Sequence, residues 1–529
     1  MKDYSFRRFS SLIDSVAVNS TSLKPNITRK LSTRVLGSIP IPHRTIPEPR
    51  GQDLDFVNVA HSHLIHSDWA KLELLSSGLT AFRVKHVLLR IQKDHVLSLE
   101  FFNWVEKKEA SSHTLETHSI ILHILAKNRK FRLAESILRS IIVSDSIDLP
   151  AKLFEALLYS YRLCCSSPCV FDSLFKTFAH MKKFRNASDT FCQMKDYGFL
   201  PNVESCNAYL SSLLSLERTD IALAFYSAMR RDRISPNVYT LNMVMRAYCK
   251  LGNLQKAKEV LEKMESMGLS PNLVSYNTLI AGYCSKGLLG LAMKTKALMG
   301  NKGVLPNLVT FNTLINGFCK EGKLHEANKI FTEMKFMNIA PTTVTYNTLI
   351  NGYSQVANSE MGSQLYEEMT RNQVKADILT YNARILGLCK EGKTKKAAYL
   401  VKELDKENLA PNSSTFAALI SGQCVKNNSE CAFQLYKSMI RSGCHPNGHV
   451  FQMLVSAFCR NKDLDGAVQV LREMFERSRA PDLSLFSELC TELCQRGKAQ
   501  LAVTLCSEME ARHLLPGGFD KAKIINTCQ

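Results

Sequence analysis

Asparagine side chains recur in this sequence at a fixed step of 35 residues. The series is Asn207, Asn242, Asn277, Asn312, Asn347 and Asn382. A carboxamide carries both a hydrogen-bond donor and an acceptor at short reach, so a row of them is suited to binding the edges of nucleobases. An alternative is that each Asn caps a helix, since Asn favours such positions. The surrounding apolar spacing places each Asn several residues inside a helix, where Asn is a poor helix former, and this favours base binding.

Cations occur in the same register, each eight residues after an asparagine of this series or, for the last cation, after Gln452, which lies on the same register. They are Lys250, Lys320, Lys390 and Arg460. Residues four and eight apart lie on one face of an α-helix, so we expect these cations on the face that carries the asparagines. A row of cations beside hydrogen-bonding side chains suits the phosphates of a nucleic acid.

The charge of the whole chain agrees with a polyanionic partner. The formal net charge is +19, and residues 1–50 contain only nine Lys or Arg against three Asp or Glu, so most of the excess lies beyond them. A basic protein body indicates binding to a polyanion such as nucleic acid. No run of 18 or more apolar residues occurs, so we expect no membrane helix.

Several other residue types show which elements must position these side chains. Prolines fall on one register of 35 at Pro201, Pro236, Pro271, Pro306, Pro341, Pro411, Pro446, Pro481 and Pro516. Cysteines keep the step at Cys249, Cys284, Cys319, Cys389, Cys424, Cys459 and Cys494. Alanine and methionine series, which include Ala292 and Met299, do the same. A chain of 529 residues is too long for one compact core, and this periodicity predicts a repeat array.

Each repeat reads as two helices. In repeat 273–307, residues 274–286 have helical apolar spacing and stop near Gly287, a second helix starts at 289, and Pro306 begins the turn into the next repeat. The alanines allow two antiparallel helices to pack closely, and the methionines fill the seam between repeats. Because no helix pair can bury its apolar face alone, neighbouring repeats must stack into a continuous core.

The register divides the chain into five segments. Ten full repeats fit residues 168–517, residues 115–167 hold degenerate or truncated repeats, and residues 46–114 are an N-terminal region with a further degenerate repeat near 80–114. Residues 1–45 are rich in Arg, Ser and Thr with few acids, which is typical of a transit peptide, and 29–32 resemble a mitochondrial processing site. A disordered basic tail is the alternative. Residues 518–529 form a C-terminal tail.

The repeat resembles a known family. Residues 274–284, 309–319 and 344–353 are similar to the first helix of the pentatricopeptide repeat, and 268–272 are similar to its closing turn. The resemblance implies an all-α fold, a right-handed superhelical α-solenoid of 35-residue helix-turn-helix repeats. It implies a pure-repeat protein of the P class in a plant organelle, a mitochondrion or alternatively a chloroplast.

The resemblance also implies that each repeat reads one RNA base with its fifth and last residues. The pairs are Asn207/Asn237, Asn242/Asn272, Asn277/Asn307, Asn312/Thr342, Asn347/Asp377 and Asn382/Asn412. In the family, Asn with Asn prefers a pyrimidine, C more than U, Asn with Asp prefers U, and Asn with Thr is poorly defined. The expected target is therefore a pyrimidine-rich tract, Y-Y-Y-N-U-Y from the 5′ end, with N undetermined. Four pairs have no defined base: Asp172/Asn202, Ala417/Asn447, Gln452/Asp482 and Ser487/Gly517.

The family further holds each base between the second residues of adjacent repeats. Those expected to do so are Tyr239, Val274, Val309, Val344 and Leu379. Glu204, Ser414 and Ser484 are weak substitutes, so we expect most of the binding energy from residues 238–412.

Other chemistry finds little support. The cysteine series lies in apolar faces of separate repeats, so the cysteines are expected to be buried small hydrophobes rather than metal ligands. The cluster of His61, His63 and His66 lacks a Cys or carboxylate frame, and no zinc deaminase signature or other catalytic motif occurs. We expect no metal, no cofactor and no enzymatic activity.

The sequence therefore predicts a protein that binds single-stranded RNA and acts by occupancy in RNA processing, stability, splicing or translation, together with organellar RNA-processing proteins. A protein-interaction scaffold is the main alternative, since α-solenoids also bind peptides. The asparagine row with its cations argues against that alternative, because a peptide groove has no reason to keep both in register. An enzyme would need a site in residues 46–114, where none is recognised.

Overall fold

A computed structural model describes residues 39–42, 45–143 and 149–514 of the chain. Every regular element in these ranges is helical, and no strand occurs within them. The expected transit peptide, 1–45, lies almost wholly outside the described residues, as does the expected tail, 518–529. The described chain forms two compact parts, one ending at Ser275 and one beginning at Tyr276.

The helices before the regular repeats are less regular in length and spacing than those that follow. They are α2 (Gln52–Ile65), α3 (Trp69–Glu73), η1 (Ser76–Gly78), α4 (Ala81–Ile91), α5 (His95–Lys108), η2 (Ala110–Ser112), α6 (Leu115–Lys127), α7 (Phe131–Val143) and α8 (Leu149–Tyr161). Residues 46–79, which show no period in the sequence, thus also contain helices. One apolar core, which includes Val57, Leu125 and Phe171, joins these helices to the repeats that follow.

Ten helix pairs follow in the register that the prolines define. The first helices are α9 (Cys169–His180), α11 (Val203–Ser215), α13 (Val238–Lys250), α15 (Leu273–Ser285), α17 (Leu308–Lys320), α19 (Thr343–Gln355), α21 (Ile378–Lys390), α23 (Ser413–Val425), α25 (Gly448–Arg460) and α27 (Leu483–Gln495). The second helices are α10 (Phe184–Asp196), α12 (Thr219–Arg231), α14 (Leu254–Ser266), α16 (Leu289–Asn301), α18 (Leu324–Phe336), α20 (Ser359–Arg371), α22 (Thr394–Lys406), α24 (Ser429–Arg441), α26 (Leu464–Glu476) and α28 (Ala499–Ala511).

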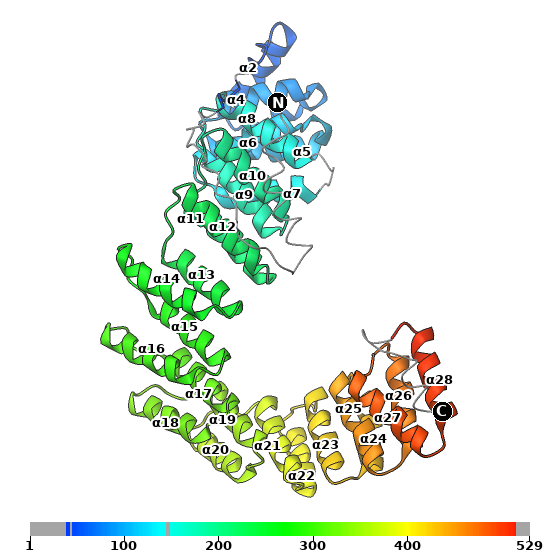
Figure 1. Cartoon of the computed structure of the whole chain (residues 1–529). Coiled ribbons are helices and arrows are strands. Elements are labelled where there is room, and N and C mark those ends of the chain that lie inside the picture. Colours follow the sequence, from blue (N-terminus) through cyan, green and yellow to red (C-terminus); the bar gives the residue numbers. More distant parts are fainter. Residues whose placement is uncertain (1–38, 43–44, 144–148, 515–529) are drawn as a thin grey trace, which may run out of the picture. The chain divides into compact units, whose positions relative to one another are not determined.

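In the C-terminal part, these helices form two layers. Figure 1 shows the first helices α17, α19 and α21 stacked in chain order, with the second helices α18, α20 and α22 covering one side of them. The expected α-solenoid of 35-residue helix-turn-helix repeats is therefore confirmed. This arrangement leaves the other side of the first-helix layer free of a second helix.

Local chemistry explains where each helix starts and stops. Gly287 has a φ of +69° just after α15, a conformation that terminates a helix and that glycine adopts without a Cβ clash. Proline removes a backbone donor after most of the second helices, as at Pro306 after α16, and the chain turns there; Ala376 takes its place after α20. The alanine and methionine series are buried as expected, and Ala292 and Met299 are both 0% exposed.

The cysteine series has a packing role that the sequence did not reveal. A Cβ added to Gly317 would lie 2.7 Å from Cys284 Sγ, and one added to Gly422 would lie 2.7 Å from Cys389 Sγ. Each of these thiols therefore fills the space that the missing side chain leaves on the first helix of the next repeat. The glycine lets two first helices approach closely, and the cysteine fills the gap.

Candidate nucleic-acid interface

The fifth and last residues of a repeat are hydrogen-bonded to each other. In the N-terminal part, the Nδ2 atoms of Asn207 and Asn242 donate to Oδ1 of Asn237 and Asn272 over 3.2 and 3.3 Å. In the C-terminal part, the corresponding bonds are Asn277 to Asn307 (3.4 Å), Asn347 to Asp377 (2.9 Å) and Asn382 to Asn412 (3.1 Å). Five of the six expected pairs thus bring their side chains together.

The sixth expected pair lacks this bond. The Asn312 amide accepts a 2.8 Å hydrogen bond from Thr345, and the Thr342 hydroxyl instead lies 3.3 Å from that of Thr345. The hydroxyl of Thr342 contacts Thr345 in place of the amide nitrogen of Asn312. This repeat therefore presents different groups from its neighbours.

The last residue, rather than the fifth, caps the following helix. Oδ1 of Asp377 accepts from the backbone N–H of Thr380 at the start of α21, and Asn412 does the same at α23. Asn347 lies inside α19 and makes no such cap. Helix capping, the alternative role considered for the asparagine series, is thus performed by the last residue of the pair and not by the asparagine in the fifth position. The cap holds the last residue at the helix N-terminus, directly beside the fifth.

Exposed apolar side chains flank these pairs on the first-helix layer. The second residues of five repeats are between 55% and 62% exposed. They are Tyr239, Val274, Val309, Val344 and Leu379. A regular series of exposed valines and similar residues is unusual, because such side chains are normally buried. The series provides apolar contacts that could flank a flat, partly apolar ligand such as a base.

The four expected cations differ in how freely they can meet a phosphate. Lys250 pairs with Glu217 over 3.3 Å, Lys390 donates to the Gln355 side chain over 2.6 Å, and Arg460 donates to a carbonyl of α23 over 3.2 Å. Lys320 makes no hydrogen bond or ion pair with the described residues and is exposed. Lys250, Lys390 and Arg460 thus lie against the preceding repeat. There they also face the C-terminal, negative end of the first helix of that repeat.

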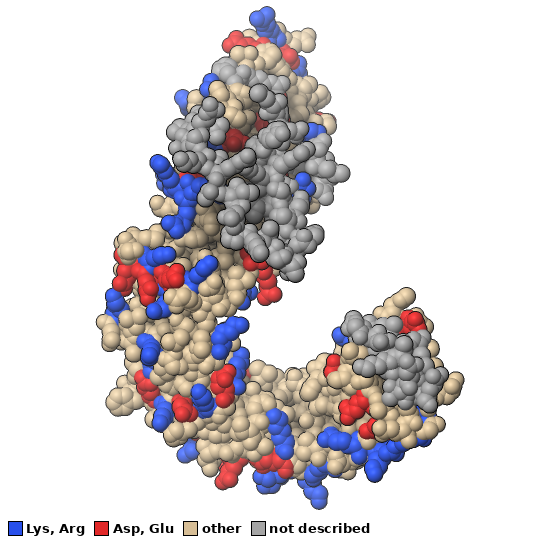
Figure 2. Space-filling model, in the orientation of Figure 1, with Lys and Arg blue, Asp and Glu red and all other residues tan. Residues whose placement is uncertain are grey.

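Charge over the rest of the surface is mixed. Figure 2 shows Lys and Arg interspersed with Asp and Glu on the face in view, with wide uncharged areas between them. The basic excess is thus distributed rather than gathered in one patch on this face. This leaves the hydrogen-bonding series as the more specific feature of the molecule.

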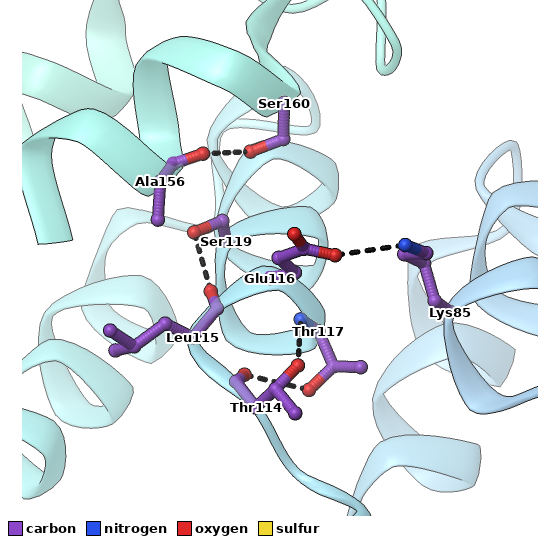
Figure 3. Close-up of polar contacts among 8 residues, drawn as sticks. All are labelled: Lys85, Thr114, Leu115, Glu116, Thr117, Ser119, Ala156 and Ser160. Atoms are coloured by element: carbon purple, nitrogen blue, oxygen red, sulfur yellow. Dashed lines mark hydrogen bonds and ion pairs between the residues drawn. The ribbon is translucent and has the colours of Figure 1, made fainter. Parts of the chain in front are cut away.

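The N-terminal helices carry different chemistry at equivalent positions. Lys85, the fifth residue of α4, forms a 2.8 Å ion pair with Glu116 of α6, while the Ser119 hydroxyl donates to Leu115 in its own helix over 2.6 Å (Figure 3). The ion pair and the local hydrogen bond occupy these side chains. No asparagine pair of the kind seen later is found among helices α4 to α8.

The first full repeat also departs from the pattern. Asp172 is buried, its Oδ1 accepts from the backbone N–H of Asn202 over 2.9 Å, and its burial raises the pKa of the carboxyl to about 6. Burial is the largest influence on the pKa of this carboxyl, and it favours the protonated, neutral form.

The later repeats lack the hydrogen-bonded pair, and a cavity of about 430 Å³ lies among them. It opens on the first-helix layer of α23, α25 and α27, and its lining includes Gln452, Arg460, Glu488 and Glu492. Ala417 cannot hydrogen-bond through its side chain, and no bond joins Gln452 to Asp482. Two carboxylates beside this cavity do not suit a phosphate backbone.

The residue types that bind metal ions are not grouped together in the described part of the chain. Among the described residues, no group of three His, Cys, Asp or Glu side chains could hold a metal ion, and the cluster on α2 with His61 is no exception. Burial raises the pKa of Cys284 to about 11 and that of Cys389 to about 12, so both remain thiols at neutral pH. A protonated, buried thiol is a poor ligand.

The fold and this surface define an α-solenoid repeat protein with one polar pair per repeat. The model of the PPR repeat family matches residues 201–250, 236–284, 271–320, 306–355, 341–390, 376–425 and 414–460, and the PPR repeat model matches 449–478. Together they cover 201–478, just over half of the 529 residues. The chain belongs to the pentatricopeptide repeat family.

Individual relatives are plant proteins. A mitochondrial pentatricopeptide repeat-containing protein of Arabidopsis thaliana is 65% identical over 229 residues, which are 43% of this chain and 43% of the relative. A second mitochondrial one from the same plant is 30% identical over 165 residues, 30% of this chain and 25% of the relative. The matched region spans less than half the length of these relatives. The chain is also similar to the crystal structure of the maize pentatricopeptide repeat protein PPR10. The alignment covers 87% of this chain and 74% of the PPR10 chain, at 19% identity and a TM-score of 0.48.

Proposed function

We propose that this protein binds single-stranded RNA through its first-helix layer and reads a pyrimidine-rich tract at one base per repeat. The observation that carries the proposal is the hydrogen-bonded pair of fifth and last residues, which recurs in five of six consecutive repeats beside an exposed apolar side chain. The pentatricopeptide repeat is one of the modules that read one base with two or three side chains.

The hydrogen bonds within a pair support a difference between its two kinds. In Asp377, Oδ1 is occupied by Asn347 and Thr380, so Oδ2 is the oxygen that can accept from a ligand. In Asn412, Oδ1 is occupied in the same way, and the amide nitrogen can donate. Uracil carries a donor at N3 and cytosine an acceptor there. The Asp pair therefore favours U and the Asn pairs favour C.

The proposed target follows from the order of the pairs. Repeats starting at 203, 238 and 273 read pyrimidines, the repeat at 308 reads an undetermined base, the repeat at 343 reads U, and the repeat at 378 reads a pyrimidine. The protein acts by occupying its RNA rather than by catalysis, in a mitochondrion, with a chloroplast as the alternative. The mitochondrial relative supports that location. A fluorescent fusion of the full chain, imaged with markers for both organelles, tests it.

Binding of the full chain to short RNAs tests the function. One RNA carries the proposed tract and the other its purine counterpart, and each is titrated at two salt concentrations. We expect a clear preference for the tract, which falls when Asn277 and Asn347 are changed to Ser. Asn301→Ser on the second helix α16 is the matched control. Equal, weak and strongly salt-dependent binding of both RNAs would refute base reading, and the scaffold alternative would then explain the surface better.

A further inference from the structure

A third side chain completes each base-reading pair, and it comes from the next repeat. It is the third residue of that repeat, always a threonine or serine after an Asn in the fifth position. These residues are Thr240, Ser275, Thr310, Thr345, Thr380 and Thr415. All six are 0% exposed. They therefore cannot touch RNA, and any influence on recognition must pass through their neighbours.

Each hydroxyl donates to the amide oxygen of the fifth residue. The distances from Oγ1 or Oγ to the asparagine Oδ1 are 2.7 Å for Thr240 to Asn207, 2.7 Å for Ser275 to Asn242, 2.7 Å for Thr310 to Asn277, 2.8 Å for Thr345 to Asn312, 2.6 Å for Thr380 to Asn347 and 2.6 Å for Thr415 to Asn382. These are among the shortest side-chain hydrogen bonds of the interface. The contact is present even at Asn312, which lacks the bond to a last residue.

The contacts of the Thr380 hydroxyl show which acceptor receives its hydrogen. Thr380 Oγ1 accepts from the backbone N–H of Asp377 over 3.1 Å as part of the helix cap. Its single hydrogen is then available for donation, and the nearer acceptor is Asn347 Oδ1 at 2.6 Å, against 2.9 Å for Asp377 Oδ1.

This donation fixes which end of the amide faces which neighbour. With its oxygen on Thr380, the Asn347 amide must turn Nδ2 toward Asp377 Oδ1, as observed. The reverse orientation would set two acceptor oxygens against each other. A rotated amide would exchange donor for acceptor on the side that faces a base, so its orientation decides what the repeat can read.

In the later repeats, both the fifth-position asparagine and the third-position hydroxyl are absent. After repeat 413–447, where the fifth residue is Ala417, the third residue of the next repeat is Val450. After repeat 448–482, with Gln452, it is Leu485. The caps themselves need no hydroxyl, because Asn447 still accepts from the backbone of Val450 over 3.0 Å. A third-position hydroxyl thus follows all six asparagines, and also Asp172 as Ser205, while the helix cap at Asn447 forms without one.

We propose that the buried third-position hydroxyl of each following repeat is a specificity-determining positioning residue, which locks the fifth-position amide in the orientation that reads the base. The proposal rests on the proposed function of RNA binding. It assigns each base to three residues in two repeats, with the third held away from RNA.

Removing one hydroxyl tests the proposal at one base. The full-length Thr380→Val variant keeps the shape of the side chain, and Thr380→Ser keeps the hydroxyl. Binding is measured to RNAs with U or C at the base of repeat 343–377, and with either base at that of repeat 273–307. We expect a preference for U over C of roughly tenfold in the wild type and the Ser variant. It should fall to about twofold or less in the Val variant, with the other base unaffected. Thr370→Val, an exposed site on α20, is the matched control.

Installing the contact where it is missing gives a test that does not depend on a weakened fold. Ala417→Asn restores a pair with Asn447, and the double variant Ala417→Asn/Val450→Thr adds the hydroxyl. We expect the double variant to prefer a pyrimidine at that base by roughly fivefold. The single variant should show little preference.

The outcomes separate the two proposals. A wild-type protein with no base preference would overturn the proposed function. A wild-type preference that persists in Thr380→Val, or an Ala417→Asn variant as selective as the double variant, would overturn the positioning role alone. A loss at every base in Thr380→Val, with melting temperature lowered, would assign that hydroxyl to stability only and overturn the proposal as well.

Discussion

The side-chain amide of Asn347 donates a 2.9 Å hydrogen bond to Oδ1 of Asp377, thirty residues later in the same repeat. Burial raises the pKa of Asp377, but hydrogen bonds from Thr380 and Asn347 lower it by more, so the pKa lies below its usual value. The carboxylate is therefore ionised at neutral pH, with one oxygen committed to its neighbours. The other oxygen is the acceptor that a uracil N3–H requires.

Replacing that acceptor with a donor should change the base. In Asp377→Asn, Oδ1 can still cap α21, so we expect nearly wild-type stability. The outer group becomes an amide nitrogen, and the preference at this base should shift from U to C, by about 1–2 kcal/mol. Titrations with the two RNAs measure it. Asp482→Asn is the matched change at a last residue without a paired asparagine, and it should alter neither preference. An unchanged preference in Asp377→Asn would contradict the assignment.

The exposed valines should contribute affinity without sequence selectivity. Val344→Ser removes an apolar contact but little buried area, since Val344 is 62% exposed. We expect binding to weaken by about 1 kcal/mol for all RNAs, with the melting temperature nearly constant. Val356→Ser, at an exposed valine just beyond α19, serves as the control and should leave affinity unchanged. Equal effects of the two substitutions would show that Val344 makes no contact with the ligand.

The free cation should act through salt dependence. Lys320 has no partner among the described residues, whereas Lys390 is bonded to Gln355. Lys320→Ala should lower the slope of log Kd against log salt by about one, with a smaller change for Lys390→Ala. Lys329→Ala, on the second helix α18, is the control. A slope that Lys320→Ala leaves unchanged would exclude a phosphate contact there.

Close approach of the first helices can be tested by adding one methyl group. In Gly422→Ala the new Cβ would lie 2.7 Å from Cys389 Sγ and 3.2 Å from its backbone, so we expect a loss of about 1–3 kcal/mol of stability. The same change at Gly448, where nothing lies within 4 Å, should be neutral or slightly stabilising. Thermal unfolding of both variants decides whether the contact is tight.

The buried Asp172 predicts a pH effect on stability. Burial raises its folded pKa to about 6 from 3.8, so the folded chain binds a proton more tightly than the unfolded chain does. Its unfavourable contribution is present above pH 6 and is relieved as pH falls toward 4, by an amount on the order of 1–3 kcal/mol. Relative to Asp172→Asn, the wild type should therefore gain melting temperature between pH 7.5 and pH 5. A constant difference would show that the carboxyl is not desolvated.

Most of the fold and part of the interface could be predicted from spacing alone. The step of 35 gave the helix bounds because proline, Gly287 and the apolar pattern act locally. The pairing of Asn347 with Asp377 came only from family resemblance, since thirty residues separate them. Thr380 was missed because its hydroxyl serves a different repeat, and nothing in its own helix marks that role. The match of Gly422 with Cys389, and the bonds that occupy Lys390, likewise depend on neighbours that only the packed structure brings together.

The three hydrogen-bonded residues of each proposed base-reading site also bear on how repeats can be exchanged between such arrays. A transplanted segment 343–377 would carry Asn347 and Asp377 but would leave Thr380 behind, so its selectivity would depend on the acceptor array. A fragment that ends three residues later, at Thr380, would carry the whole triad. A duplication by a full step of 35 within the six asparagine repeats keeps the fifth, last and following third positions at the same spacing, whatever its endpoints. Lineages could therefore lengthen the array by unequal crossing-over at arbitrary points, while engineers who exchange modules must choose their junctions with care.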